Sequence, residues 1–172
     1  GAGASNVAMV EAAPRLAAPA GGLAVTHQTG EHDLDLVRNG YRDAGLEARV
    51  EPFLFAMDRE MKEADLVICR AGATTLAELT AAGKPAVLIP LPTAADDHQR
   101  RNAEALAAAG AAELLEQSEM TGATLAGRII GLVTDSDRRV AMSGAARGLA
   151  KPDAAKAIVD RAFELIGRME QP

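Results

Sequence analysis

Short apolar segments alternate along the chain with longer segments in which apolar residues recur at helical spacing. The short segments predict strands. Two of them, Asp65–Arg70 and Pro85–Pro90, are continuous apolar runs, as is typical of strands buried on both faces of a parallel sheet. The predicted strands are Leu23–His27, Ala48–Pro52, Asp65–Arg70, Pro85–Pro90 and Ala112–Leu115.

The longer segments predict helices between these strands and after the last one. These are Asn6–Leu16, Asp33–Gly45, Met57–Glu63, a helix from Thr74 or Thr75 to Gly83, His98–Ala109, Thr121–Val133, Ser136–Gly148 and Asp153–Arg168. This alternation predicts an α/β fold, a Rossmann-like parallel sheet with helices on both faces, followed by a helical C-terminal tail. Such sheets bind ligands at the carboxyl ends of their strands, so we expect a site in the loops after the strands.

The first predicted helix follows a glycine-containing segment, Gly1–Ser5, and no strand precedes it. A glycine-rich turn before a helix normally follows a strand. Two interpretations remain open: the chain was cut at that point, or the fold lacks an edge strand.

Length and composition indicate one domain, residues 1–172. A chain of this length with 48% apolar residues is large enough to bury a core of its own. Aromatic residues make up only 2%, so the core must be built from Ala, Leu, Val and Ile.

Charge and cysteine content narrow the classes of function. A net charge of −6 without a Lys/Arg cluster argues against nucleic acid as a partner. An anionic ligand is not excluded, because amides at a helix N-terminus can hold a phosphate without Lys or Arg. The single cysteine, Cys69, cannot form a disulfide within the chain, and no apolar run is long enough to span a bilayer. We therefore expect a cytoplasmic protein.

The segment from Cys69 to Glu78 places a strand end, a glycine turn and a helix start within ten residues. Gly72 allows close approach of a ligand, and the first helical amides point toward the strand ends. Glu78 shares a helix face with Thr74 and Thr75, where its carboxylate could accept two hydrogen bonds from a ribose diol. Thr75 and Glu78 also fit a capping box, in which Glu78 only bonds the backbone, and the pattern leaves both interpretations open.

A second polar segment follows the fourth predicted strand. Asp96 or Asp97 can cap the next helix, which places His98, Gln99 and Asn102 in its first turns. Polar side chains at this edge suit a sugar with several hydroxyls, although a solvated helix start would show the same pattern.

Two shorter segments follow the first two strands. After the first, Thr29 and the amide of Gly30 can meet a phosphate, whereas a lone His27 is more often packed than catalytic. After the second, Phe53 and Leu54 could flank a nucleobase, or Phe53 could belong to the core. No spacing of His, Cys and carboxylates indicates a metal site, and no cofactor is expected.

Together these segments resemble the C-terminal domain of the MurG family, glycosyltransferase family 28 of the GT-B superfamily. The resemblance lies in His27–Gly30, Val50–Phe53, Met57, Ala64-Asp65, Cys69–Glu78, Ala81–Pro85, His98-Gln99, Asn102-Ala103, Gly110–Ala112 and Pro152–Ala154. Members move N-acetylglucosamine from UDP-N-acetylglucosamine to a lipid-linked muramoyl-pentapeptide precursor of peptidoglycan, with inversion and generally without a metal. The resemblance implies a donor-binding domain.

The resemblance also implies what each candidate residue holds. Phe53 and Leu54 would hold the uracil, Glu78 the ribose, Gly72, Ala73, Thr74 and Thr75 the diphosphate with Thr29 and Gly30 nearby, and His98 and Gln99 the N-acetylglucosamine beside Asn102. Arg70 would support the site. No catalytic residue is expected in this domain, since the likeness assigns the base to an N-terminal acceptor domain that is absent here.

The acceptor domain would belong to the same parent chain or to a separate subunit, and the lipid-linked acceptor would be reached only through it. The parent enzyme would be peripheral on the inner face of the plasma membrane, and this chain alone would bind the donor without transferring sugar. Two alternatives stay open: a subunit of a split transferase that uses another UDP-sugar, and a non-catalytic UDP-sugar-binding module.

Overall fold

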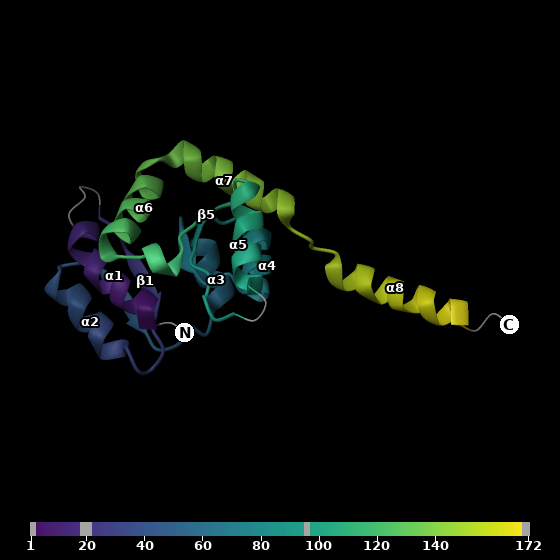
Figure 1. Ribbon diagram of the computed structural model, residues 1–172, viewed down its shortest axis with the longest axis horizontal. Helices are drawn as coiled ribbons and strands as arrows, with labels where there is room; N and C mark the ends of the chain where they lie inside the picture. Colours follow the sequence, from purple (N-terminus) through teal and green to yellow (C-terminus); the bar gives the residue numbers. More distant parts are fainter. Residues whose placement is uncertain (1–2, 18–21, 95–96, 170–172) are drawn as a thin grey trace.

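The computed structural model describes residues 3–17, 22–94 and 97–169 of the chain. Strands and helices alternate as expected, and three helices follow the last strand (Figure 1). The bounds are α1 Gly3–Leu16, β1 Val25–Gln28, α2 Leu34–Asp43, β2 Ala48–Glu51, α3 Met57–Glu63, β3 Val67–Cys69, α4 Ala73–Ala82, β4 Ala86–Leu88, α5 His98–Ala108, β5 Ala112–Leu114, the 3₁₀ helix η2 Gln117–Glu119, α6 Gly122–Thr134, α7 Ser136–Leu149 and α8 Ala154–Met169. Every predicted strand and helix is present, and only η2 was not predicted.

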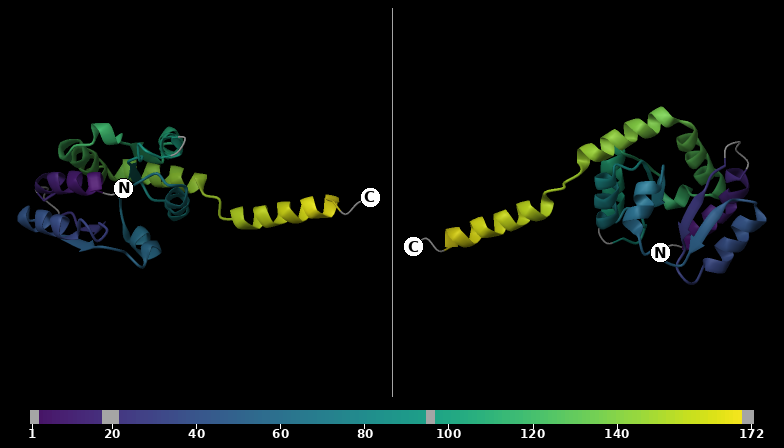
Figure 2. Two further views of the ribbon diagram at one scale, coloured as in Figure 1. Left: turned by 60° about the horizontal axis from the view of Figure 1, so that its bottom comes forward. Right: turned by 180° about the vertical axis from the view of Figure 1, so that it is seen from behind.

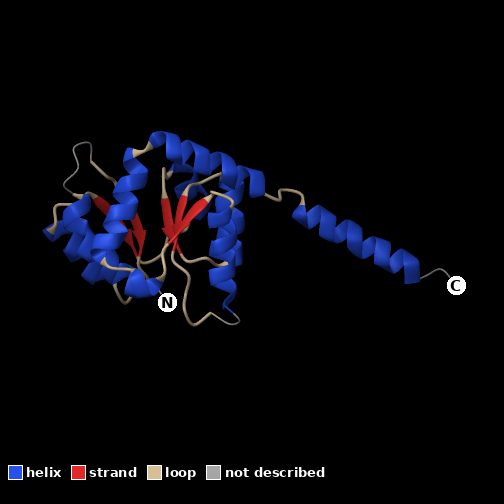
Figure 3. Ribbon diagram, turned by 45° about the horizontal axis from the view of Figure 1, so that its top comes forward, coloured by secondary structure: helices blue, strands red, loops and turns tan. Residues whose placement is uncertain are grey.

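The strands form two parallel sheets. β1 pairs with β2, and the second sheet has the order β3-β4-β5 (Figure 3). The α/β class with parallel strands between helices is confirmed, but the sheet is divided. The physical reason is that no strand among the described residues lies between β1 and β3 to bond with both.

Strand β4 shows that helices cover both faces of the second sheet. Val87 and Ile89 pack into a core cluster with residues of α1, α2 and α6. Ala86 and Leu88 point the other way, into a smaller cluster with residues of α4 and α5. β4 is therefore buried along its whole length, whereas β3, which pairs on one side only, is half-buried at every position.

Helix α8 stands away from the rest of the molecule (Figure 2). It follows α7 after a short connection and continues outward instead of packing back onto a sheet (Figure 1). In the described part of the chain, no helix has both the length and the apolar character that a membrane span needs.

Candidate functional site

The carboxyl ends of the strands meet the starts of helices α1 and α5. Asn6, in the first turns of α1, donates from Nδ2 to the carbonyl of Thr29, just after β1, at 3.0 Å. Asn102 of α5 donates from Nδ2 to the carbonyl of Ala71, just after β3, at 3.1 Å. The loops that the sequence singled out after β1 and β3 are thus each tied to the start of a helix.

The start of α4 presents unpaired backbone amides. The helix begins at Ala73, and its N-cap, Gly72, makes no side-chain cap bond. Within the described residues, the amides of Ala73, Thr74 and Thr75 have no hydrogen-bond acceptor. A Cβ added to Gly72 would meet only Thr75 Oγ1, at 3.9 Å, so the space beside the turn is open. Free amides at a helix start suit an anion.

Glu78 lies further along the same helix, with an exposed side chain. Its carboxylate has no ion-pair or hydrogen-bond partner in the part of the chain that the structure describes. Because α4 starts before Thr75, Thr75 is not the N-cap, and the capping-box interpretation is wrong. The carboxylate is therefore available to a ligand.

The polar residues of α5 also hold the neighbouring loops. Gln99 accepts a hydrogen bond at Oε1 from the amide of Leu91, 3.0 Å away, which fixes the chain after β4. This bond leaves the amide NH₂ of Gln99 for another partner, just as the Asn102 bond leaves that residue's Oδ1. His98 is the first residue of the helix and is exposed.

Neither aspartate expected to cap α5 is seen to do so. Asp97 occupies the N-cap position in the left-handed region, with φ of 54°, and its side chain makes no cap bond. Capping by Asp97 is therefore wrong, and Asp96 lies outside the described residues.

The turn after β1 uses its own amides to extend the pairing with β2. The amide of Thr29 donates to the carbonyl of Glu51 at 3.0 Å, and that of Gly30 donates to the carbonyl of Pro52 at 3.1 Å. The Thr29 hydroxyl donates to the carbonyl of Gly30 at 2.8 Å. The Gly30 amide, expected to meet a phosphate, is thus already paired.

The loop after β2 exposes an aromatic pair. Phe53 is 56% exposed and Phe55 93% exposed, and their rings meet edge to face with centroids 5.1 Å apart. Leu54 between them is buried, and its amide donates to Gln28 Oε1 at 2.9 Å. Phe53 is therefore not a core residue. Sequence reasoning missed Phe55, although the scarcity of aromatic residues in the chain was a signal for it.

Arg70 and Cys69 close β3 in different ways. Arg70 Nη1 donates to the carbonyls of Ile89 and Pro90 at 3.2 Å each, and Nη2 donates to Gln117 Oε1 at 2.7 Å. Burial lowers the pKa of this guanidinium. Burial raises the pKa of the Cys69 thiol to about 12, so the thiol stays protonated and is unsuited to act as a nucleophile.

His27 is packed between two hydrogen-bond partners. Nδ1 lies 2.6 Å from Tyr41 Oη, and Nε2 lies 3.0 Å from Asn6 Oδ1. Burial lowers the pKa of His27 to about 4, so the ring is neutral near pH 7. Across the described ranges, no three His, Cys, Asp or Glu side chains are grouped as a metal would require.

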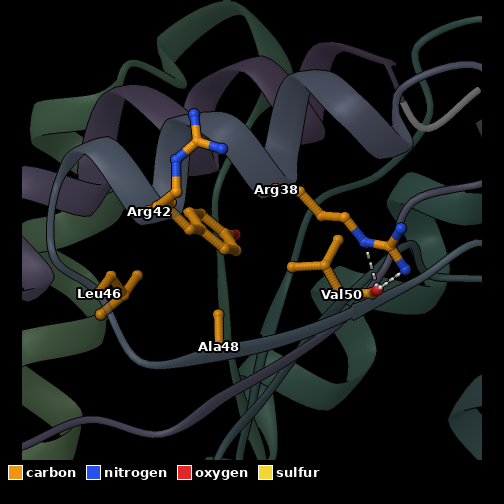
Figure 4. A pocket seen from close by; sticks show the side chains of 6 residues that line it. Arg38, Arg42, Leu46, Ala48 and Val50 are labelled. Carbon is orange, nitrogen blue, oxygen red and sulfur yellow. Dashed lines mark hydrogen bonds between the residues drawn. The ribbon is translucent and has the colours of Figure 1, made fainter.

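Two hollows lie away from the strand ends. One of about 380 Å³ lies between α2 and β2, where Arg38 donates to the carbonyl of Val50 (Figure 4). The other, of about 320 Å³, lies between the end of α4 and α7 and is lined in part by Lys84, Arg139 and Arg147. The candidate site is therefore an open surface, defined by its unpaired polar groups.

The chain was compared with known families and proteins. The Glycosyltransferase family 28 C-terminal domain matches residues 1–158. A UDP-N-acetylglucosamine--N-acetylmuramyl-(pentapeptide) pyrophosphoryl-undecaprenol N-acetylglucosamine transferase from Anaeromyxobacter sp. (strain Fw109-5) is 49% identical over 168 residues, which cover 98% of this chain and 44% of the relative. The transferase of the same name from Geobacter sulfurreducens is 50% identical over 155 residues, covering 90% of this chain and 43% of the relative.

A solved structure is similar as well. The crystal structure of Acinetobacter baumannii MurG matches with a TM-score of 0.85 and 38% identity, over 95% of this chain and 47% of that one. The chain thus spans less than half the length of these relatives.

Proposed function

The chain belongs to the glycosyltransferase family 28 C-terminal domains, and from this membership we propose that it is the donor-binding half of an N-acetylglucosaminyltransferase acting on UDP-N-acetylglucosamine. One observation carries the proposal: α4 presents three unpaired amides and, one turn further, a carboxylate free of protein partners. These two features offer complementary groups to a diphosphate and to a ribose diol on one helix.

Each part of the donor has a matching surface in this proposal. The diphosphate lies at the α4 amides, where the helix dipole favours negative charge. Glu78 accepts hydrogen bonds from the ribose hydroxyls, and the loop with Phe53 and Leu54 flanks the uracil. The N-acetylglucosamine faces His98 and Gln99. When an acceptor oxygen attacks the anomeric carbon, the same amides stabilise the charge that grows on the leaving UDP.

The rest of the reaction needs a second half. The relatives are named as acting on a muramoyl-pentapeptide attached to undecaprenol, and the part of them that this chain does not span is the candidate acceptor domain. We place the acceptor base there, and the parent enzyme at the cytoplasmic face of the membrane that holds the lipid. A different UDP-sugar, or binding without catalysis, remains the alternative outcome of the tests.

Calorimetric titration with UDP-N-acetylglucosamine, UDP-glucose and UDP tests this proposal. We expect binding that prefers the N-acetyl sugar, and Glu78→Ala should raise its Kd by about tenfold or more through two lost charge-assisted hydrogen bonds. Glu47→Ala, which removes an exposed carboxylate just before β2, is the matched control and should leave the Kd unchanged. Equal affinity of Glu78→Ala and the unaltered chain would overturn the ribose role, and absence of any binding would overturn the proposal.

A further inference from the structure

A continuous chain of hydrogen bonds crosses α1, β1 and α2 beside the candidate site. Tyr41 Oη lies 2.6 Å from His27 Nδ1, and His27 Nε2 lies 3.0 Å from Asn6 Oδ1. Asn6 Nδ2 then lies 3.0 Å from the carbonyl oxygen of Thr29 and 2.7 Å from Asp33 Oδ2. Thr29 and Asp33 are the two ends of the turn between β1 and α2.

The chemistry of the groups fixes the direction of every bond in this chain. Both hydrogens of Asn6 Nδ2 go to oxygens that can only accept, so Asn6 Oδ1 must itself accept from His27 Nε2–H. A neutral imidazole with its proton on Nε2 has an acceptor at Nδ1, and Tyr41 must therefore donate to it. The chain has one polarity, from the Tyr41 hydroxyl to the turn.

Burial supports this assignment. Asn6 is 1% exposed and Tyr41 1% exposed, so each unpaired group here would be costly. Burial also keeps His27 neutral, by lowering its pKa to about 4, and raises the pKa of the Tyr41 hydroxyl, which stays protonated.

The turn receives an unusual clamp. Asp33 occupies the N-cap position of α2, yet its side chain makes no cap bond there. Its Oδ2 bonds Asn6 instead, and the same amide NH₂ holds the carbonyl of Thr29. One side chain of α1 thus determines where both ends of the turn lie.

We propose that Asn6 is a positioning residue for the donor site: through the polarised chain that starts at Tyr41, it clamps the turn from Thr29 to Asp33 in the place where this turn borders the diphosphate of the bound nucleotide. The ligand part of this inference rests on the proposed function, whereas the clamp rests on the hydrogen bonds alone. A clamp of this kind should affect binding of the diphosphate and leave binding of the nucleoside, held by the loop at Phe53, unchanged.

The first measurement is the tautomer of His27 in the full chain, from long-range nitrogen–proton correlations at neutral pH. We expect the proton on Nε2, and we expect Asn6→Ala to abolish this preference because the acceptor is gone. A proton on Nδ1 in the unaltered chain would overturn the polarity and with it the clamp. Asn39→Ala, on the exposed face of α2, is the control and should leave the tautomer unchanged.

The second measurement compares UDP with uridine as ligands in NMR titrations. Asn6→Ala should weaken UDP by about tenfold and leave uridine unaltered, a split that a general loss of stability does not produce. His27→Ala should show the same split if Asn6→Ala fails to fold, and His27→Gln should restore UDP affinity, because the Gln amide nitrogen can take the place of Nε2.

Equal loss of both ligands, or of neither, in the Asn6 and His27 variants would overturn the positioning role. A chain with the expected tautomer that binds uridine and UDP equally well would overturn the place of the turn at the diphosphate while leaving nucleotide binding intact. Absence of binding to either ligand in the unaltered chain would instead contradict the proposed function, and the ligand role of Asn6 would fall with it.

Discussion

At the scale of single residues, His27 links the hydrogen bonds of the turn to the stability of the whole chain. Burial lowers its pKa from 6.5 to about 4 in the folded state, so the unfolded chain takes up a proton that the folded chain still refuses. The stability that this residue contributes is therefore complete above pH 6.5 and is lost as the pH falls toward 4.

The pH dependence of unfolding tests this linkage. Between pH 7.5 and 5.5, the unaltered chain should lose about 1.3 kcal/mol of unfolding free energy through His27. His27→Gln, which has no titrating ring, should lack that part of the loss in urea titrations, whereas His32→Gln at an exposed position should keep it. Parallel pH profiles for the unaltered chain and His27→Gln would contradict the assignment.

Arg70 offers a second prediction at this scale. Its guanidinium joins the end of β3 to two carbonyls after β4 and to the 3₁₀ helix η2. Arg70→Ala should lower the unfolding free energy by about 1–3 kcal/mol, because it leaves half-buried acceptors without their donor. Arg101→Ala, on the exposed face of α5, should change it little. Equal effects of the two substitutions in urea unfolding would show that the bridge adds nothing.

At the scale of elements, the packing of α1 on α2 depends on the absence of a side chain. A Cβ on Gly40 would lie 2.5 Å from Val10 Cγ1. Gly40→Ala should therefore destabilise the chain by about 1–3 kcal/mol, although alanine is the better helix former. In the double variant with Val10→Ala the clash is gone, so the two substitutions should be strongly non-additive in a double-mutant cycle. Additive effects would mean that α2 shifts to admit the methyl group.

Sequence patterns predicted the elements better than their ends. Periodicity located every strand and helix because burial on one face leaves a local signature, and Met57–Glu63 was correct at both ends. The start of α4 was placed one or two residues late, since Thr74 and Thr75 look like caps whereas Gly72 provides none. Asp97 failed as a cap because its backbone adopts a left-handed conformation that no local pattern announced.

The candidate site could be predicted only where it is local. Glu78 and the amides of α4 lie within one short segment, so their proximity follows from helix geometry alone. The bonds of Asn6 join residues 21 to 27 positions apart, and only the folded arrangement of α1 beside β1 brings them together. The pairing of the Gly30 amide with Pro52 was missed for the same reason, because it depends on how far β1 and β2 extend their ladder.

At the scale of the whole molecule, the division into two sheets explains why β3 is less buried than its sequence suggests. Its apolar residues predict a strand covered on all sides, and β4, with the same character, is fully buried. β3 hydrogen-bonds on one edge only, so each of its side chains keeps part of its exposure. The two sheets still share one core, because the cluster beneath α1 and α6 contains residues of both β2 and β4.

Helix α8 carries the last prediction, because its apolar residues face solvent. Ile158, Val159, Phe163 and Ile166 are all more than half exposed, and helical spacing puts them on one face. The helix packs on nothing in the body, so a chain ending at Ala150 should unfold with a free energy within about 0.5 kcal/mol of the full chain. The full chain should self-associate with rising concentration in sedimentation velocity, Phe163→Glu should do so less, and the shortened chain should stay monomeric. Lys151→Ala, outside the apolar face, is the control. A shortened chain that unfolds more easily would show that α8 packs on the body in solution, and undiminished association would place the sticky surface elsewhere.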